Sequence, residues 1–240
     1  LYKLGMNFDS EAAVQFSDEV QEFVSYHAIL FSSELAKEKG KYFTYEGSKW
    51  DRGLFPIDTF SMLEEERGMK TGIDKTSRID WTSVREHVRS YGMRNSNCMA
   101  IAPTATIANI SGCFPSIEPI YRNLYVKSNM CGEFSVINEY LVDDLKKLDL
   151  WSDAMLEKIK AKDGDIQNIT EIPIHIRTKY KGAFEIDPHW VIRHAAFRTK
   201  WIDQSQSVNI FTAVTQGRVL SDIYMAAWKS GLKTTYYLRT

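Results

Sequence analysis

The sequence predicts an α/β protein, and two observations support this prediction. Amphipathic patterns with helical spacing alternate along the chain with single short apolar runs of strand length. We identify no hairpin turn between these runs, so consecutive strands are expected to be separated by helices. This order favours parallel α/β units. Residues 1–240 are expected to form a single partial domain that is truncated at both ends, because no cap or tail follows the last predicted strand.

The longest pattern predicts a helix that begins after Asp9 and Ser10 and ends before Gly40. Its apolar residues recur at steps of three and four, which predicts that one face of the helix is buried. The residues of this stripe are Ala13, Phe16, Val20, Phe23, Val24, His27, Leu30, Phe31 and Leu35.

Caps, periodicity and turn residues predict the other elements in order. Residues 47–56 are expected to form an ordered loop, and residues 160–181 are polar enough to indicate an excursion over the surface. Helices are predicted over residues 80–92, 138–148, 152–159, 187–204 and 219–228. Strands are predicted over residues 98–102, 121–126, 208–213 and 232–238.

Composition excludes several classes of protein. The chain has 30 basic and 31 acidic side chains, and this near-neutral balance argues against direct nucleic-acid binding. No apolar run approaches the ~18 residues of a membrane helix, and no signal peptide precedes the first helix. We therefore expect a cytoplasmic protein that has no membrane partner.

The cysteines and histidines do not predict a metal site. Cys98, Cys113 and Cys131 are too few and too far apart for a disulfide framework, and we expect each to be a small buried apolar residue. His189 and His194 are five residues apart, so they do not share one face of a helix. No metal ligand or bound cofactor is expected in this chain.

The segment from Ile101 to Asn109 could bind an anion. A strand and Pro103 are followed by small and hydroxyl residues that open a helix, and free N–H groups at a helix start attract phosphate. Thr104 and Thr106 would add hydroxyl donors. By itself, however, an ordinary strand-to-helix turn explains the pattern better, because such turns are more common than phosphate sites.

Tyr236 and Tyr237 lie in the last predicted strand. Adjacent strand residues point to opposite faces, so the simple interpretation places one phenol in the core and one on the surface. The alternative is a redox relay, in which two phenols that share a hydrogen bond pass an electron and a proton together.

Four segments taken together resemble one family. IAPTATIAN followed by SIEPIYRNLYVKSN, then WIDQSQSVNIF, then GLKTTYYLRT resembles the large (α) subunit of class I ribonucleotide reductases, and FTYEGSKWDRGLFPIDT fits the same family. The resemblance covers all 240 residues in the order and spacing of the family. It implies most of the second half of a ten-stranded α/β barrel that also carries several long helices.

The resemblance implies that the protein reduces ribonucleoside diphosphates to 2′-deoxyribonucleoside diphosphates for DNA synthesis. A radical from a separate small (β) subunit reaches a cysteine in the barrel, which takes the 3′-hydrogen of the ribose. Tyr236 and Tyr237 match the tyrosines that relay this radical. The substrate diphosphate would be bound by the residues that match the family's phosphate loop, which are Pro103, Thr104, Ala105, Thr106 and Ile107.

Other parts of the family are absent from this sequence. The pattern of its finger-loop motif, Asn-x-Cys-x-Glu, is matched only by residues 129–133 (NMCGE). Leu1 matches a point downstream of the family's finger loop, so none of the three cysteines is assigned a thiyl or redox role. The isolated chain is therefore expected to be inactive and to need the N-terminal part of the large subunit. The complete enzyme would be an α homodimer that binds ATP or dATP effectors, takes electrons from thioredoxin or glutaredoxin, and pairs with a β subunit holding a dimetal and tyrosyl radical centre.

Three alternatives remain open at this point. A vitamin-B12-dependent class II reductase has a similar phosphate loop, but it makes its radical in the same chain and needs no tyrosine relay. A non-catalytic nucleotide-binding or regulatory fragment is the second alternative. The third is a natural split subunit that assembles with a separately encoded N-terminal half.

Overall fold

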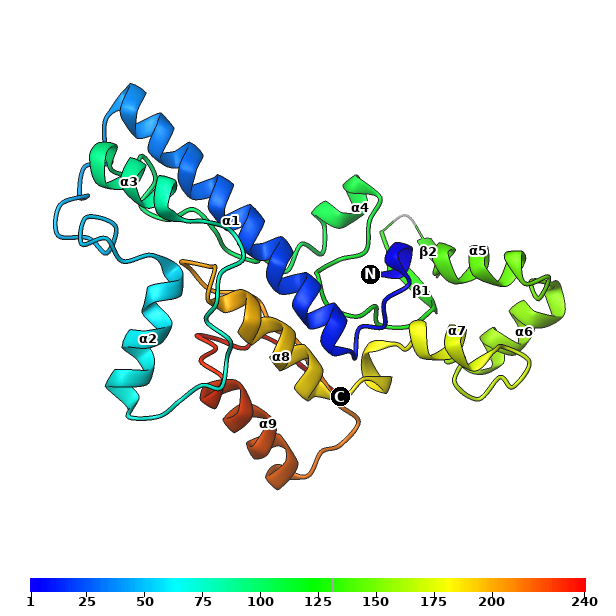
Figure 1. Cartoon of the computed structure of the whole chain (residues 1–240). Coiled ribbons are helices and arrows are strands. Elements are labelled where there is room, and N and C mark those ends of the chain that lie inside the picture. Colours follow the sequence, from blue (N-terminus) through cyan, green and yellow to red (C-terminus); the bar gives the residue numbers. More distant parts are fainter. Residues whose placement is uncertain (131) are drawn as a thin grey trace. The chain divides into compact units, whose positions relative to one another are not determined.

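A computed structural model describes residues 1–130 and 132–240 (Figure 1). The helices are α1 (Glu11–Lys39), α2 (Pro56–Arg67), α3 (Thr82–Tyr91), α4 (Ile107–Ser111), α5 (Glu139–Lys147), α6 (Asp153–Ala161), α7 (Ile174–Lys179), α8 (Pro188–Thr199) and α9 (Gly217–Lys229), with 3₁₀ turns at Tyr2–Leu4 and Ala183–Glu185. The strands are β1 (Leu124–Asn129), β2 (Gly132–Ile137), β3 (Ile210–Phe211) and β4 (Leu238–Arg239).

The chain divides into two compact units. The first unit contains Leu1–Ala13, Thr104–Trp190 and Phe211–Ala213, and the second contains Val14–Pro103, Val191–Ile210 and Val214–Thr240. A domain can contain more than one compact unit, so the single partial domain over residues 1–240 stays a prediction.

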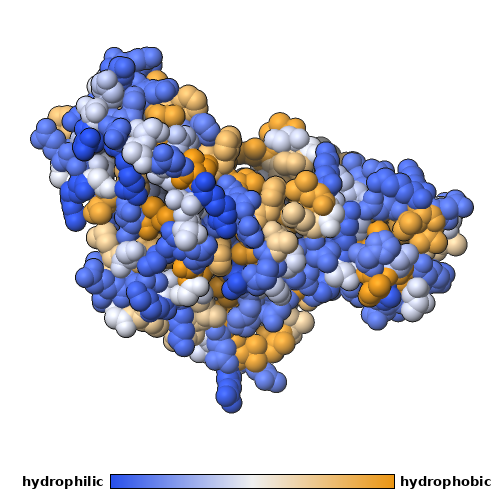
Figure 2. All heavy atoms as spheres, in the orientation of Figure 1, coloured by the Kyte–Doolittle hydropathy of each residue, from blue (hydrophilic) through white to orange (hydrophobic). Residues whose placement is uncertain are grey.

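The long predicted helix is confirmed as α1, but most of its predicted buried face is wrong. Phe23 and Phe31 are each 57% exposed, and Val20, Val24 and Leu35 are also exposed. Figure 2 shows apolar surface along the course that α1 follows in Figure 1. The buried face is instead largely polar, and its residues include Asp18, Glu22, Ser25, Ser32 and Ser33.

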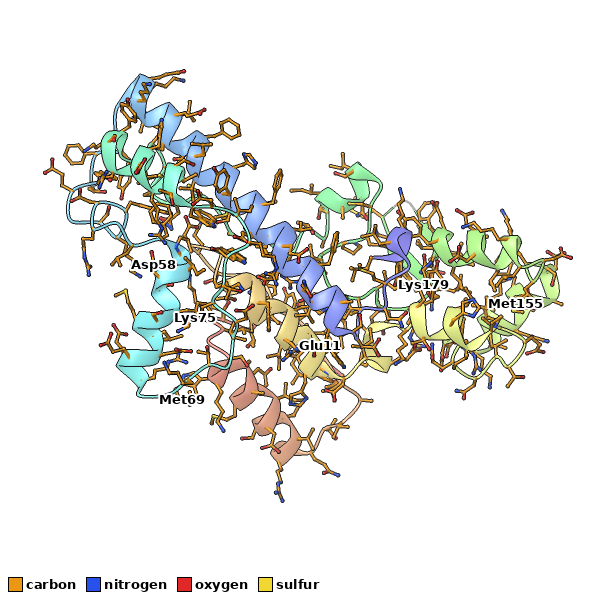
Figure 3. The ribbon with its side chains drawn as sticks, in the orientation of Figure 1. Glu11, Asp58, Met69, Lys75, Met155 and Lys179 are labelled. Atoms are coloured by element: carbon orange, nitrogen blue, oxygen red, sulfur yellow. The ribbon has the colours of Figure 1, made fainter. Side chains whose placement is uncertain are left out.

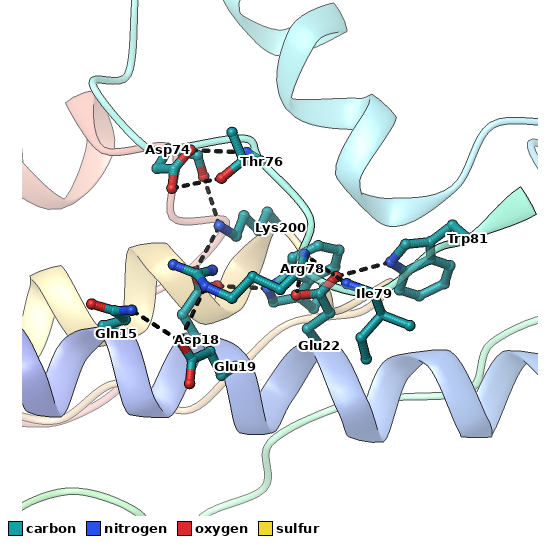
Figure 4. A network of polar contacts seen from close by, with 11 residues as sticks. Gln15, Asp18, Glu19, Glu22, Asp74, Thr76, Arg78, Ile79, Trp81 and Lys200 are labelled. Carbon is teal, nitrogen blue, oxygen red and sulfur yellow. Dashed lines mark hydrogen bonds and ion pairs between the residues drawn. The ribbon is translucent and has the colours of Figure 1, made fainter.

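Polar partners explain why α1 buries Asp18. Asp18 has no exposed surface, and its Oδ2 accepts hydrogen bonds from Lys200 Nζ (2.9 Å) and Arg78 Nη1 (3.1 Å). The Trp201 indole N–H donates to Asp18 Oδ1 over 2.6 Å. Lys200 is likewise fully buried, and its ammonium also donates to the carbonyl of Asp74 (2.6 Å). Figure 4 shows this network.

Glu22, one turn further along α1, ties down the segment before α3. Its Oε1 accepts hydrogen bonds from the backbone N–H groups of Arg78 (3.0 Å) and Ile79 (3.1 Å) and from the Trp81 indole (3.1 Å). Trp81 then stacks on Trp201 with ring centroids 5.7 Å apart. The two buried carboxylates of the helix, Asp18 and Glu22, are therefore compensated by opposite charges or N–H donors, as buried charges must be.

The apolar core of the second unit surrounds these tryptophans. As predicted, Gly92 follows the end of α3, and Trp81, Val84 and Val88 are buried, whereas Tyr91 is exposed. The other members of the cluster are Ile29, Tyr45, Trp50, Phe55, Met93, Met99, Trp201 and Ile202.

Helix α2 was not predicted from the sequence. It begins with Pro56 as its first residue, and the Asp58 carboxylate accepts a hydrogen bond from the backbone N–H of Phe55 (2.8 Å). Proline in the first turn followed by a capping acid is a helix-start signal. This signal was not recognised in the sequence, because Pro56 was assigned to the turn-rich loop predicted over residues 47–56.

In the first unit, the surface excursion predicted for residues 160–181 is wrong. Ile166 and Ile172 have no exposed surface, and Tyr180 is also fully buried. Its hydroxyl donates to Asp144 Oδ2 (2.8 Å), which also accepts from Lys179 (2.7 Å). Figure 3 labels Lys179 and Met155 in this unit. The many polar residues of this stretch obscure its few buried apolar side chains in the sequence. The core of the unit consists of Leu141, Leu145, Met155, Ile159, Ile166, Ile169, Ile172, Ile176 and Tyr180.

The predicted absence of hairpins is also wrong, because β1 and β2 pair antiparallel, with Leu124 opposite Ile137. The strand predicted over residues 121–126 therefore lies three residues further along the chain. Gly164 approaches the start of β1, where an added Cβ would lie 2.5 Å from the carbonyl oxygen of Leu124. Only glycine fits this contact, and its φ of +83° favours glycine too.

Parallel pairing is present but short. Ile101 forms an isolated parallel bridge with Gln206, in place of the strand predicted over residues 98–102. The strands predicted over 208–213 and 232–238 are reduced to β3 and β4, which pair with each other. The described residues thus form a helix-rich α/β fold with two two-stranded sheets and contain no closed barrel.

Several helix boundaries agree with the sequence. Asn138 and Ser152 accept hydrogen bonds from backbone N–H groups at the starts of α5 and α6, and Pro188 is the first residue of α8. Helix α8 ends at Thr199, five residues before the predicted end. In α5, Leu141, Val142 and Leu145 are buried as predicted, whereas Leu148 is 40% exposed.

The buried ion pair predicts a large effect of Asp18→Asn on stability. This change leaves the buried ammonium of Lys200 without a counter-charge, so the free energy of unfolding should fall by about 3–5 kcal/mol. Urea denaturation measures the change. Glu19→Gln is the matched control, because Glu19 also pairs with Arg78 (3.0 Å) but both side chains are more than a third exposed, so about 1 kcal/mol or less is expected. Equal effects of the two substitutions would contradict a special role for the buried pair.

Candidate functional site

The predicted anion-binding loop forms a turn between residues 98–102 and α4. Thr104 has a φ of +37°, which is uncommon for a residue other than glycine, and Thr106 is the N-cap of α4. Because α4 has only five residues, the dipole of a long helix is not available here. Any affinity for an anion must come mainly from individual N–H and hydroxyl groups of the turn.

The loop is held by the segment that follows α4. The backbone N–H of Ser116 donates to Thr104 Oγ1 (3.0 Å), and the N–H of Ala108 donates to the carbonyl of Thr104 (3.0 Å). Ser116 Oγ in turn accepts from the N–H of Glu118 (3.0 Å). Two of the segments that carried the family resemblance are therefore in direct contact, and the contact fixes the unusual conformation of Thr104.

The open side of the loop exposes backbone donors. Ala105, Thr106 and Ile107 are exposed, and within the described part of the chain no acceptor is bonded to their N–H groups. Three consecutive N–H groups that face solvent can bind the oxygens of a phosphate. Pro103 contributes no N–H and leads the chain into the turn.

Tyr236 and Tyr237 lie in contact, contrary to the alternating-strand interpretation. Their ring centroids are 4.2 Å apart with an angle of 54° between the planes, and the hydroxyl of Tyr236 donates to that of Tyr237 over 3.4 Å. The rings are tilted rather than parallel. Both side chains are about half exposed, at 51% and 49%.

The backbone explains this arrangement. β4 begins only at Leu238, so the tyrosines precede the regular strand and do not follow its alternation. The N–H of Tyr236 donates to the carbonyl of Val208 (2.7 Å), and the carbonyl of Tyr237 accepts from the N–H of Ile210 (2.8 Å). The N–H of Tyr237 is directed to the side-chain oxygen of Asn209 (3.4 Å).

A cation and the shared hydrogen bond both act on the phenols. The Arg239 guanidinium lies 4.9 Å from the centre of the Tyr237 ring, which is a cation–π distance. The hydrogen bond to Tyr237 raises the pKa of the Tyr236 phenol above its ordinary value. A phenol that is protonated and hydrogen-bonded to its neighbour can give up a hydrogen atom along that bond.

The two candidate segments belong to different units. Thr104–Ile107 lie in the first unit and the tyrosines in the second. The second unit also contains a pocket of about 610 Å³, whose lining includes Trp50, Asp203 and Lys233 but neither tyrosine.

Sequence reasoning missed Asn209, Arg239 and Ser116. Asn209 lies within a segment that supported the family resemblance, but no role was assigned to it. The sequence did contain a signal for Asn209, namely the strands predicted over 208–213 and 232–238. If these two strands pair in parallel, residues 208–210 lie beside the tyrosines, as the structure shows. No local signal identified Ser116, since its contact with Thr104 depends on the turn of the chain after α4.

The cysteines differ from the prediction of burial. Cys113 is exposed and Cys98 is half-buried, while Cys131 lies outside the described residues. Burial, together with nearby Asp203, raises the pKa of the Cys98 thiol to about 11, so this thiol is protonated at neutral pH. It lacks the thiolate character of a reactive cysteine.

The described residues contain neither a metal-binding cluster nor a helix that could span a membrane. Across residues 1–130 and 132–240, no group of three or more His, Cys, Asp or Glu side chains could hold a metal ion. No helix within these ranges has both the length and the apolar character needed to cross a membrane.

Comparison with known proteins identifies the family. The model of the family described as "Ribonucleotide reductase, barrel domain" matches residues 1–238. The ribonucleoside-diphosphate reductase subunit alpha of Chlamydia pneumoniae is 52% identical over 241 residues, which cover 100% of this chain and 23% of that protein. The large chain of Neurospora crassa is 40% identical, covering 99% of this chain and 24% of its own length.

A solved structure agrees with this assignment. The class Id ribonucleotide reductase alpha subunit of Actinobacillus ureae is similar with a TM-score of 0.73 and 26% identity, covering 100% of this chain and 36% of that one. The chain thus spans about a quarter of the length of the curated relatives that it matches.

The hydrogen bond between the phenols predicts a pKa change. In Tyr237→Phe the partner hydroxyl is lost, so the pKa of Tyr236 should fall toward the ordinary tyrosine value of about 10. Titration of ¹³Cζ-labelled tyrosines by NMR measures it, with Tyr224→Phe on α9 as the control. An unchanged Tyr236 pKa in Tyr237→Phe would show that the two hydroxyls are not hydrogen-bonded in solution.

Proposed function

The chain belongs to the ribonucleotide reductase family as part of its barrel domain, and we propose that it is part of the large subunit of a ribonucleoside-diphosphate reductase. The observation that carries this proposal is the family match over residues 1–238, together with 52% identity to a named reductase subunit over the whole chain. In this proposal the chain contributes a diphosphate-binding loop and a tyrosine relay to an enzyme that makes 2′-deoxyribonucleoside diphosphates.

The contact between Tyr236 and Tyr237 supports the relay. A radical that reaches Tyr237 leaves its phenol oxygen one hydrogen atom short. The hydroxyl of Tyr236 already donates to that oxygen, so its O–H bond can break while a new O–H bond forms on Tyr237. One electron and one proton move together, Tyr237 is reduced and Tyr236 is oxidised, and no charge is left behind in the pair.

The exposed N–H groups of Ala105, Thr106 and Ile107 support the diphosphate loop. The positive φ of Thr104 turns the chain, and the bond from Ser116 holds that turn. A diphosphate would be bound by backbone N–H groups and the Thr106 hydroxyl, and this binding would orient the ribose. No side chain of this loop would take part in the radical chemistry.

The remaining machinery belongs to other parts of the enzyme. The oxidant is the dimetal and tyrosyl radical centre of the small subunit, and the cysteine that attacks the ribose lies in the N-terminal part of the large subunit. We propose that residues 1–240 complete a ten-stranded barrel with that part, in an α homodimer that takes ATP or dATP effectors and is reduced by thioredoxin or glutaredoxin. The isolated chain should not reduce CDP.

The relay predicts loss of turnover in Tyr237→Phe. In the complete large subunit, with the small subunit added, phenylalanine keeps the ring but has no O–H bond to exchange, so CDP reduction should fall to background. Binding of CDP should stay within about twofold, because Tyr237 is not one of the proposed phosphate donors. Tyr224→Phe is the control and should retain wild-type turnover.

Three outcomes would contradict this assignment. Wild-type turnover in Tyr237→Phe would refute the relay. If adenosylcobalamin sustains CDP reduction without a small subunit, the protein is a class II enzyme instead. If the complete protein binds CDP but does not reduce it, the non-catalytic alternative is favoured.

The loop predicts weaker substrate binding in Thr104→Pro. Proline fixes φ near −65°, so it cannot adopt the φ of +37° observed at this position. The turn should open, and the dissociation constant for CDP should rise by about tenfold, equivalent to roughly 1.4 kcal/mol. Calorimetry on the complete subunit measures it, with Ile110→Ala as the control because that side chain is 85% exposed on α4. Equal affinities of the two variants would rule out the loop.

A further inference from the structure

Lys233 lies three residues before Tyr236 and has an unusual set of partners. Its ammonium donates to three consecutive carbonyl oxygens, those of Ile202 (3.2 Å), Asp203 (3.0 Å) and Gln204 (2.7 Å). An ammonium has three N–H donors, so these carbonyls use all of them. Hydrogen bonds from a charged donor are stronger than neutral ones, and Lys233 is thus a strong anchor between the two segments.

The residues after Lys233 continue the same pairing. The hydroxyl of Thr234 donates to the carbonyl of Gln206 (3.1 Å). The N–H of Tyr236 then bonds to Val208, and the carbonyl of Tyr237 to Ile210, as described above. Both segments advance in the same direction, so the contacts form one parallel register that begins at Lys233.

The segment that Lys233 holds is itself fixed to the core. The Asp203 carboxylate accepts from the backbone N–H groups of Cys98 (2.6 Å) and Met99 (2.9 Å), and the N–H of Gln204 donates to the carbonyl of Met99 (3.2 Å). Ile202 is 2% exposed. Because these residues are firmly held, a side chain bonded to them transmits a fixed position to the segment that follows it.

We propose that Lys233 is a positioning residue for the tyrosine pair, because its ammonium sets the register that brings the two phenol oxygens together. The inference rests on the proposed relay. A shift of one residue in the register would turn each side chain to the other side of the segment and separate the phenols. Lys233 takes no part in the electron or proton transfer.

The test uses the complete large subunit with its small subunit and CDP. Lys233→Met keeps the length of the side chain but removes its three donors. Because misplacement by about 1 Å can lower a rate on the order of 100-fold, we expect a drop of at least about tenfold in kcat, with KM for CDP unchanged. Lys233→Arg should restore much of the loss, since a guanidinium can still donate to carbonyls.

Lys49→Met is the matched control. Lys49 lines the same pocket as Lys233 and is likewise exposed, but within the described residues its ammonium is not bonded to the tyrosine segment. Its removal should leave kcat and KM at wild-type values. A drop equal to that of Lys233→Met would show that a positive charge in the pocket matters rather than the register, and would overturn the proposal.

A spectroscopic measurement separates positioning from general destabilisation. With 3-aminotyrosine at position 236 as a radical trap, the radical that forms on mixing with the small subunit is measured by electron paramagnetic resonance. Lys233→Met should slow its formation, while hydrogen exchange at the amide of Tyr236 becomes faster and exchange in α9 stays unchanged. Radical formation at the wild-type rate would overturn the proposal.

Two further variants keep the outcomes distinct. If Lys233→Met does not fold, Thr234→Val is the deciding variant, because it removes the next hydrogen bond in the same register. Thr234→Val should slow radical formation to a smaller extent. Radical formation at the wild-type rate in this variant would overturn the proposal. Tyr237→Phe is measured in parallel. Turnover in Tyr237→Phe would refute the relay itself, whereas an inactive Tyr237→Phe beside a fully active Lys233→Met would refute only the role of Lys233.

Discussion

The buried contact between Asp18 and Lys200 is the constraint on which the second unit depends. Neither side chain is exposed, and neither charge can be left unpaired without a large loss of stability. Asp18 lies on α1, Lys200 directly follows α8, and Arg78 joins them from the segment before α3. Three segments that are distant in the sequence must therefore assemble together, which couples the folding of α1 to that of α8 and explains why α1 turns a polar face inward.

The same constraint extends to the tyrosine pair through the chain after α8. Lys200 and Trp201 are bonded to Asp18, and the next three residues present their carbonyls to Lys233. Segment 200–204 is thus fixed on one side by the buried carboxylate and bonded on the other to the segment that leads to the phenols. The phenols themselves are half exposed, so their geometry depends on these backbone and lysine contacts more than on packing around their rings.

The two proposed sites differ in what determines their shape. The loop at Thr104 is fixed by contacts within about a dozen residues, chiefly the bond from Ser116, and its N–H donors follow from the turn itself. The contact between Tyr236 and Tyr237 instead requires pairing with residues almost thirty positions earlier, around Val208. Changes in distant packing should therefore disturb the tyrosines before they disturb the loop.

The sequence by itself determined the features that depend on local interactions. Neighbouring residues define the caps at Asn138 and Ser152 and the start of α8 at Pro188. The family motifs, which are short local segments, indicated where both candidate sites lie. Only the tertiary structure decided which face of α1 is buried, that residues 160–181 contain core isoleucines, that β1 and β2 form a hairpin, and that the two phenols lie in contact. The reason is that caps and turns are satisfied within a few residues, whereas burial of a charge, strand pairing and register depend on partners that a local pattern does not identify.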